Sequence, residues 1–251
     1  MKNDSLGSKI SNWLSEYLTN NRLKSYVIGI SGGVDSAVSS TLCAKTGKQT
    51  IVLSMPILQA PDQLERARNH IKWLKQNFSN VESYEYDLSN VFTEFNSLFL
   101  IDHKHASANS RSRLRMITLY HIAAMNSGLV VGTGNKVEDF GVGFYTKYGD
   151  GGVDVSPIAD LTKTEVRQLA KDLGINPEIV TAKPTDGLWD DGRTDEDQIG
   201  ASYEELEWAM EYLETNSNYS LSERQNQVLD IYNKFHNANM HKMISIPIFK
   251  K

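Results

Sequence analysis

Residues 26–36, YVIGISGGVDS, place a Gly-Gly turn between a β-branched apolar run and the start of a helical pattern. A strand that enters a helix through so short a turn presents backbone N–H groups at the first helical turn. These groups and the helix dipole form an anion site, and phosphate is its usual ligand. The glycines let the backbone approach phosphate oxygens, while the hydroxyls of Ser31 and Ser36 offer additional donors. Asp35 would repel bare phosphate, so we expect it to hold a Mg²⁺ that bridges the phosphates.

The turn differs from the two most familiar nucleotide-binding loops. A Walker loop needs a glycine, four residues and then Gly-Lys-Ser/Thr, but TGKQ at 46–49 has Leu42 in the place of the first glycine. The spacing of Gly29, Gly32 and Gly33 does not match the dinucleotide fingerprint either. The turn is therefore predicted to bind phosphate without a lysine of its own. A tight strand-to-helix turn with no ligand is the structural alternative.

Strand-like runs alternate with helical patterns along the rest of the chain. Such alternation predicts an α/β fold, a single doubly wound domain over residues 1–251, with helices on both faces of a mostly parallel sheet. Residues 136–153 are glycine-rich and polar, and we expect a functional loop there because the segment is too long for a simple connector. Residues 186–200 are acidic without apolar periodicity and are predicted to be a mobile lid. The four predicted strands are residues 26–30, 50–55, 81–88 and 129–132.

The composition excludes several classes of protein. Of the 251 residues, 40% are hydrophobic and 23% charged, and the net charge of −5 gives no reason to expect nucleic-acid binding. The single cysteine, Cys43, rules out an internal disulfide and a cysteine-based metal cluster. No apolar run reaches the length of about 18 residues that a membrane helix needs. We therefore expect a cytoplasmic, soluble protein with no membrane partner.

Three motifs in order resemble one known family. SGGVDS after a buried strand resembles the pyrophosphate loop of the N-type ATP pyrophosphatases. GTGNKVE at 132–138 and YTKYGDGGVD at 145–154 are similar to motifs of the NAD synthetase family within that group. The resemblance implies an adenine nucleotide alpha hydrolase-like fold. It also implies a ligase that converts deamido-NAD to NAD with ATP and ammonia, in the last step of NAD biosynthesis.

The resemblance assigns residues to ATP and Mg²⁺. It implies that Asp35 and Glu138 hold the metal ion. Lys147 follows Glu138 by nine positions, one more than the family usually has, so Asp139 competes with Glu138 for this role. The spacing from Thr133 favours Glu138. The implied ATP contacts are Gly29, Ile30, Ser31, Gly32, Gly33, Val34, Asp35, Ser36, Thr133, Lys163 and Thr185.

The same resemblance assigns residues to the second substrate. Asp150 lies between the glycines of KYGDGG, where it could accept a proton from ammonium or from attacking ammonia. A solvated turn aspartate is an equally good interpretation of Asp150. The implied contacts with deamido-NAD are Arg113, Lys147, Asp154, His241 and Lys242.

Related activities remain as alternatives. They are another ligase of the group such as GMP synthetase, a tRNA-modifying enzyme, and a nucleotide sensor that has lost turnover. TKYGDGG argues against the first, and the acidic composition argues against the second. Glutamine-dependent relatives carry an amidase domain that this sequence lacks, so we expect free ammonia to be the nitrogen donor. Supply of ammonia by a separate glutaminase subunit is the alternative. The family is usually homodimeric, and we expect a homodimer.

Overall fold

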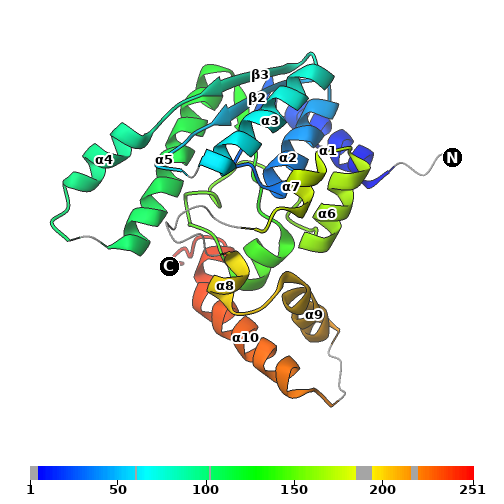
Figure 1. Ribbon diagram of the computed structural model, residues 1–251, viewed down its shortest axis with the longest axis vertical. Helices are drawn as coiled ribbons and strands as arrows, with labels where there is room; N and C mark the ends of the chain where they lie inside the picture. Colours follow the sequence, from blue (N-terminus) through cyan, green and yellow to red (C-terminus); the bar gives the residue numbers. More distant parts are fainter. Residues whose placement is uncertain (1–4, 60, 102, 185–193, 216–219) are drawn as a thin grey trace.

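The computed structural model describes residues 5–59, 61–101, 103–184, 194–215 and 220–251. Within these ranges a sheet of parallel strands forms the centre, in the order β3-β2-β1-β4 (Figure 1). The predicted strands are confirmed within a few residues at either end. Their bounds are Ser25–Gly29 for β1, Gln49–Ser54 for β2, Val81–Glu85 for β3 and Gly128–Val130 for β4.

Alternate residues of β1 point to opposite faces of the sheet, and helices cover both faces as predicted. Tyr26 and Ile28 belong to a large core cluster with α1 (Leu6–Asn20), α2 (Val34–Lys45), α3 (Pro61–Asn77), α6 (Lys163–Asp172) and α7 (Pro177–Thr181). Val27 packs on the other side against α5 (Lys104–Met125), which α4 (Ser89–Ser97) precedes. Strands β1, β2 and β4 are therefore buried on both faces, as their apolar residues require, whereas most of the edge strand β3 is exposed.

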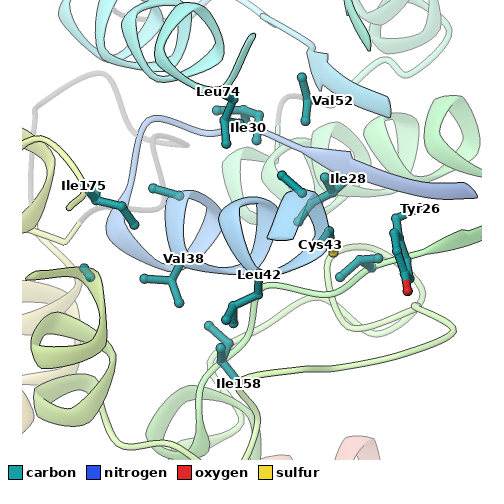
Figure 2. Packing of buried hydrophobic residues seen from close by; sticks show 14 of the residues in the cluster. Tyr26, Ile28, Ile30, Val38, Leu42, Cys43, Val52, Leu74, Ile158 and Ile175 are labelled. Carbon is teal, nitrogen blue, oxygen red and sulfur yellow. The ribbon is translucent and has the colours of Figure 1, made fainter. Parts of the chain in front are cut away.

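Helix α2 is buried almost along its whole length. Figure 2 shows Val38 and Leu42 of this helix between the strands and the residues around Ile158 and Ile175. Cys43 is fully buried in the same cluster, as expected for a small core residue. Because α2 begins directly after the Gly-Gly turn, this packing fixes the position of the turn at the end of β1.

A second hydrophobic cluster supports the C-terminal half. It joins α9 (Tyr203–Glu214) and α10 (Glu223–Met243) to a π-helix, η1 (Val137–Val142). The prediction of a loop at 136–153 was wrong for these six residues, because Val137 and Val142 bury fully against α9 and α10.

The predicted lid at 186–200 is described only in part. Residues 185–193 lie outside the described residues. Asp195–Ile199 form the short helix α8, which the sequence pattern did not predict. Thr194 starts it with a capping box, in which Thr194 and Asp197 each bond to the other's backbone N–H. Among the described helices, none combines the length and apolar character of a membrane span.

A buried histidine gives the fold a pH dependence that can be measured. His70 of α3 is 2% exposed, stacks on Trp73 and bonds to Ser40 through Nε2. Burial lowers its pKa from 6.5 to about 4. The unfolded chain therefore binds the extra proton between these two pH values, so the stabilisation is complete above pH 6.5 and is lost as the pH falls through 4.

We expect this residue to contribute up to about 3 kcal/mol to the loss of stability between pH 7 and pH 4. Urea unfolding at both pH values should show a smaller loss for His70→Gln than for the natural protein. His121→Gln, at an exposed position of α5, is the control and should behave like the natural protein. An unchanged loss in His70→Gln would disprove the assignment.

Candidate active site

A cavity of about 710 Å³ opens at the carboxyl ends of β1 and β4. In the strand order β3-β2-β1-β4 the chain leaves β1 toward β2 and later returns to the other side of β1. Ligands of open parallel sheets bind at such a reversal of strand order. Residues 29–36, 131–134 and 143–147 line the cavity, with side chains from α5, α6 and α10. Its volume lies in the range of small-molecule sites.

The Gly-Gly turn lies in this cavity with its backbone held close to α3. Gly32 has a φ of 89°, and a Cβ there would lie 2.6 Å from the carbonyl oxygen of Gln63, so only glycine fits. Ser36 Oγ donates to Gly33 O at 3.0 Å and accepts from Ser31 N at 3.2 Å. Gly33 is the N-cap of α2 and makes no side-chain cap bond. The serine hydroxyls thus shape the turn, and the start of α2 faces the cavity.

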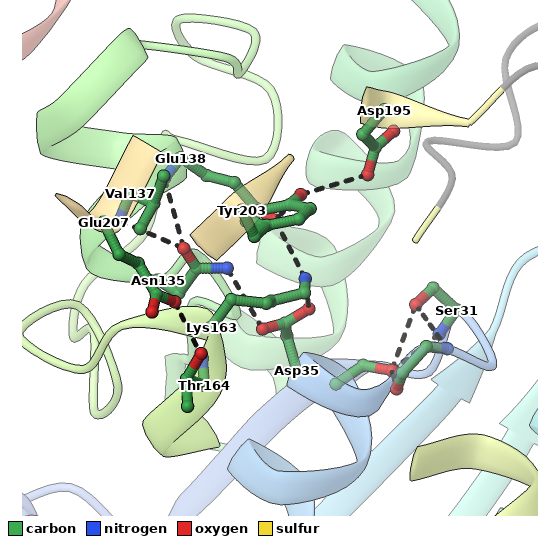
Figure 3. Close-up of polar contacts among 12 residues, drawn as sticks. Ser31, Asp35, Asn135, Val137, Glu138, Lys163, Thr164, Asp195, Tyr203 and Glu207 are labelled. Carbon is green, nitrogen blue, oxygen red and sulfur yellow. Dashed lines mark hydrogen bonds and ion pairs between the residues drawn. The ribbon is translucent and has the colours of Figure 1, made fainter. Parts of the chain in front are cut away.

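Next to the turn, one buried ammonium joins two carboxylates (Figure 3). Lys163 Nζ lies 2.6 Å from Asp35 Oδ2 and 2.9 Å from Glu138 Oε1, and the lysine side chain is 3% exposed. The ammonium also lies 4.7 Å from the centre of the Tyr203 ring, in cation–π geometry. These side chains come from α2, η1, α6 and α9, so the centre joins the two halves of the molecule.

The pKa values of the three groups depend on one another. Burial alone would lower the pKa of the Lys163 ammonium, but the two carboxylates outweigh burial and raise it. Burial raises the pKa of Asp35, an effect that Lys163 opposes and Glu138 adds to. Burial also acts to raise the pKa of Glu138, but Lys163 and the Tyr203 hydroxyl bring it below its usual value. The single positive charge of Lys163 does not balance the two carboxylates of Asp35 and Glu138, so the site is suited to a further cation.

Two residues of this centre were missed by the sequence analysis. Asn135 donates to Asp35 Oδ1 at 3.2 Å, and its own Oδ1 accepts from the backbone N–H groups of Val137 and Glu138. Tyr203 donates its hydroxyl to Glu138 Oε1 at 2.5 Å and lies 3.3 Å from Asp195. Asn135 lies within GTGNKVE and could have been found there. Tyr203 has no motif around it, and only the fold brings it to the site.

The structure separates Glu138 from Asp139. Glu138 reaches Lys163, whereas Asp139 turns toward Gly134, where a Cβ would lie 2.2 Å from either carboxylate oxygen. Burial, with the neighbouring carboxylates, raises the pKa of Asp139 to about 8. Glu138 and Asp139 are consecutive residues in the first turn of η1, so their side chains point in different directions. This geometry favours Glu138 over Asp139 as partner of Asp35.

Most of the predicted substrate contacts lie together at the cavity. Arg113 Nε donates to Lys147 O at 3.2 Å, and Lys147 Nζ donates to His241 O at 3.0 Å. Lys242 Nζ donates to the carbonyl oxygens of Gly143 and Tyr145. Arg113, Lys147, His241 and Lys242 all line the cavity. His241 and Lys242, near the end of α10, therefore lie at the cavity.

Asp150 and Asp154 have different surroundings. Asp150 is exposed in the cavity, and its Oδ1 accepts from Ser112 Oγ at 2.6 Å and from Thr146 N at 3.0 Å. Asp154 accepts from Tyr120 Oη at 3.0 Å and from Val130 N at 2.8 Å, and it is not among the described residues that line the cavity. Asp154 thus links the end of β4 to Tyr120 of α5.

The remaining ATP candidates are placed as follows. Thr133 lines the cavity between the turn and η1. Thr185 lies outside the described residues, although Ala182, Lys183 and Pro184 just before it line the cavity. Lys163 is the first residue of α6 and contacts both acids.

Comparisons with known proteins identify one family. The family model described as NAD synthase matches residues 6–246. The chain is 42% identical to an NH(3)-dependent NAD(+) synthetase of Finegoldia magna, over 83% of each chain. Among solved structures, the NMN synthetase of Francisella tularensis superposes with a TM-score of 0.87 at 31% identity, over 98% of both chains. The NH3-dependent NAD synthetase of Campylobacter jejuni gives a TM-score of 0.80 at 26% identity, also over 98% of both.

Proposed function

The chain belongs to the NAD synthase family, and on that basis we propose that it amidates the nicotinate carboxylate of deamido-NAD, using ATP and ammonia. The observation that carries the proposal is the centre of Asp35, Glu138 and Lys163 beside the Gly-Gly turn, in the cavity at the strand reversal. Phosphate binding needs the turn, and adenylation needs a cationic group beside it.

The chemistry follows from the poor reactivity of a carboxylate. Ammonia does not displace oxide from an anionic carboxylate, so one carboxylate oxygen first attacks the α-phosphorus of ATP and pyrophosphate leaves. Ammonia then attacks the carboxyl carbon, the C–O bond to AMP breaks, and one proton is released as the carboxamide forms. The backbone N–H groups of the turn would bind the departing pyrophosphate, and Lys163 would offset its charge.

The donor set beside the turn fits Mg²⁺. In this structure the ammonium of Lys163 contacts the carboxylates of both Asp35 and Glu138. Carboxylate oxygens are also the protein ligands that Mg²⁺ prefers. We propose that these two residues hold the ion. When bound, Mg²⁺ would neutralise charge on the phosphates of ATP.

Asp150 is the proposed acceptor of the proton from ammonia. Ser112 and Thr146 hold one of its carboxylate oxygens, which orients the side chain in the cavity. Water must be kept out while the adenylate exists. The lid predicted at 186–200 stays a proposal, and it follows Ala182, Lys183 and Pro184, which line the cavity.

A second substrate is favoured by one of the comparisons. The Francisella tularensis structure that superposes over 98% of the chain is named an NMN synthetase. Nicotinate mononucleotide carries the same carboxylate as deamido-NAD but lacks the adenylate half. The reaction and the ATP site would be the same for both substrates. The part of the cavity that binds the AMP moiety of deamido-NAD would stay empty with the mononucleotide.

One experiment separates the two substrates. The protein is supplied with ATP, Mg²⁺ and ammonium, and with either deamido-NAD or nicotinate mononucleotide, while the amide product and pyrophosphate are measured together. We expect a higher kcat/KM for deamido-NAD, with one pyrophosphate for each NAD. A higher kcat/KM for the mononucleotide would establish the second candidate. Amidation of xanthosine monophosphate instead would contradict both.

We also propose a homodimer, located in the cytoplasm. Helix α4 and its connection to α5 extend away from the sheet (Figure 1), and they expose many apolar side chains that a second copy could cover. The exposed side chains on α4, the connection and α5 are Val91, Phe95, Leu98, Phe99, Leu100, Ile101, Ile117, Tyr120 and Met125. The single, buried thiol of Cys43 fits a reducing compartment.

Ile117→Glu should convert the dimer to a monomer. The side chain is 68% exposed on α5, and a charge there would have to be buried without a partner in the interface. Light scattering after gel filtration measures the mass. Leu213→Glu, at an exposed position of α9, should remain dimeric. A natural protein that is monomeric, or a dimeric Ile117→Glu, would contradict the proposal.

A further inference from the structure

Side chains of α10 donate hydrogen bonds to consecutive carbonyl oxygens of the segment that carries the site. His236 Nδ1 donates to Gly141 O at 2.7 Å, and Asn239 Nδ2 donates to Val142 O at 2.9 Å. Lys242 continues the row with Gly143 O and Tyr145 O. The three donors follow one another at intervals of three residues along the helix. They contact the C-terminal end of η1, whose last carbonyl groups have no partner within the π-helix.

The segment is built to approach α10 closely. Gly143 ends η1 with a φ of 62°, and a Cβ there would lie 2.5 Å from Asn239 Cβ and 2.6 Å from Met243 Cε. Any side chain at 143 would therefore both strain the backbone and push the segment off the helix. The ring of His236 is itself held by stacking on Tyr232, at 5.6 Å between ring centres.

The held residues connect directly to Glu138. The N–H groups of Gly143 and Phe144 both donate to Glu138 O, the latter at 2.9 Å. Fixing the carbonyl groups of 141–145 against α10 thus fixes the backbone of Glu138, whose carboxylate contacts Lys163. At its other end the segment leads to Lys147, which donates back to the carbonyl oxygen of His241 on α10.

From these contacts we infer that His236 and Asn239 are positioning residues, which set Glu138 and Lys147 for the reaction through the carbonyl groups that they hold. The inference rests on the proposed function, and it assigns a role to α10 residues that no motif marks. Loss of either donor would leave a carbonyl group at the end of η1 unpaired and loosen the segment. The effect should appear in the rate of the chemical step, because the hydrogen bonds described for Asp35 and the Gly-Gly turn go to partners outside α10.

The test compares Asn239→Leu with Asn237→Leu, an exposed neighbour on the same helix. Leucine has the branched shape of asparagine with a larger volume, and it cannot donate a hydrogen bond. For Asn239→Leu we expect kcat to fall at least tenfold while the KM for ATP changes less than twofold. We also expect the amides of Gly143 and Phe144 to exchange with deuterium at least tenfold faster. Asn237→Leu should stay within twofold of the natural protein in all three measurements.

His236→Phe provides a second variant, because it keeps the stacking on Tyr232 and removes the donor. It should reproduce both effects, and it decides the matter if Asn239→Leu fails to fold. Natural kcat and natural exchange in these variants would overturn the inference while leaving the proposed function intact. If the natural protein does not amidate, the proposed function fails, and the exchange measurement alone still decides whether α10 holds the segment.

Discussion

Replacement of Asp35 by asparagine should lower kcat about a thousandfold, with little change in the melting temperature. Asparagine has the shape of aspartate but no charge, so it could neither hold Mg²⁺ nor share the Lys163 ammonium with Glu138. Removal of a single oriented electrostatic group from an active site costs about 10²- to 10³-fold in rate, and here the metal would be lost as well.

The measurement is steady-state release of pyrophosphate together with the amide product. Asp160→Asn, at an exposed position, is the matched control and should keep the natural rate. Retention of more than a tenth of the natural kcat in Asp35→Asn would remove Asp35 from the mechanism. The Gly-Gly turn would then be a tight strand-to-helix turn that binds no ligand, which is the alternative given by its sequence.

Replacement of Lys163 by methionine should destabilise the fold by about 3–5 kcal/mol at pH 7.5, because it leaves two buried carboxylates without their cation. Methionine keeps most of the volume of the lysine chain, so lost packing contributes little. The same variant should lose turnover, since nothing would offset charge on the leaving pyrophosphate.

The destabilisation should shrink as the pH falls. Burial already raises the pKa of Asp35, and Lys163, with Tyr203 and Asn135, holds the pKa of Glu138 down. Without the ammonium, both folded-state pKa values should lie above their unfolded values. The folded variant then binds protons more readily than the unfolded chain, so its stability is greatest at low pH and is lost as the pH rises.

Urea unfolding at pH 7.5 and pH 5 measures both the loss and its pH dependence. Lys171→Met, at an exposed position of the same helix, should stay within about 0.5 kcal/mol of the natural protein. A Lys163→Met protein as stable as this control at pH 7.5 would show that the carboxylates are not held by the lysine.

The sequence was sufficient for those parts of the molecule in which local pattern and tertiary packing agree. The strand around Ile28, the Gly-Gly turn and α2 are consistent at every level, because a buried strand, a glycine with positive φ and a helix start follow one another directly. The cavity-lining positions of Lys147 and Lys242 were also predictable, but only through resemblance to a family.

Other features depend on contacts between distant segments. Val137–Val142 looked like a polar loop, because its two buried valines form a helix only when α9 and α10 cover them. Tyr203 reaches Glu138 across 65 positions of sequence, and no local pattern signals that contact. Asp154 lies in a family motif, yet its carboxylate faces Tyr120 and the backbone of Val130. A motif gives the position of a residue in the chain but not the direction of its side chain.

The mechanism depends on a transfer of oxygen from the carboxylate to the nucleotide. The direct measurement is turnover of deamido-NAD labelled with ¹⁸O in the nicotinate carboxylate, followed by mass spectrometry of the nucleotides and phosphates. If the carboxylate attacks the α-phosphorus while the Gly-Gly turn holds pyrophosphate, AMP carries one labelled oxygen and pyrophosphate carries none. Formation of ADP with label in orthophosphate would contradict the account, because the carboxylate would then have attacked the γ-phosphorus.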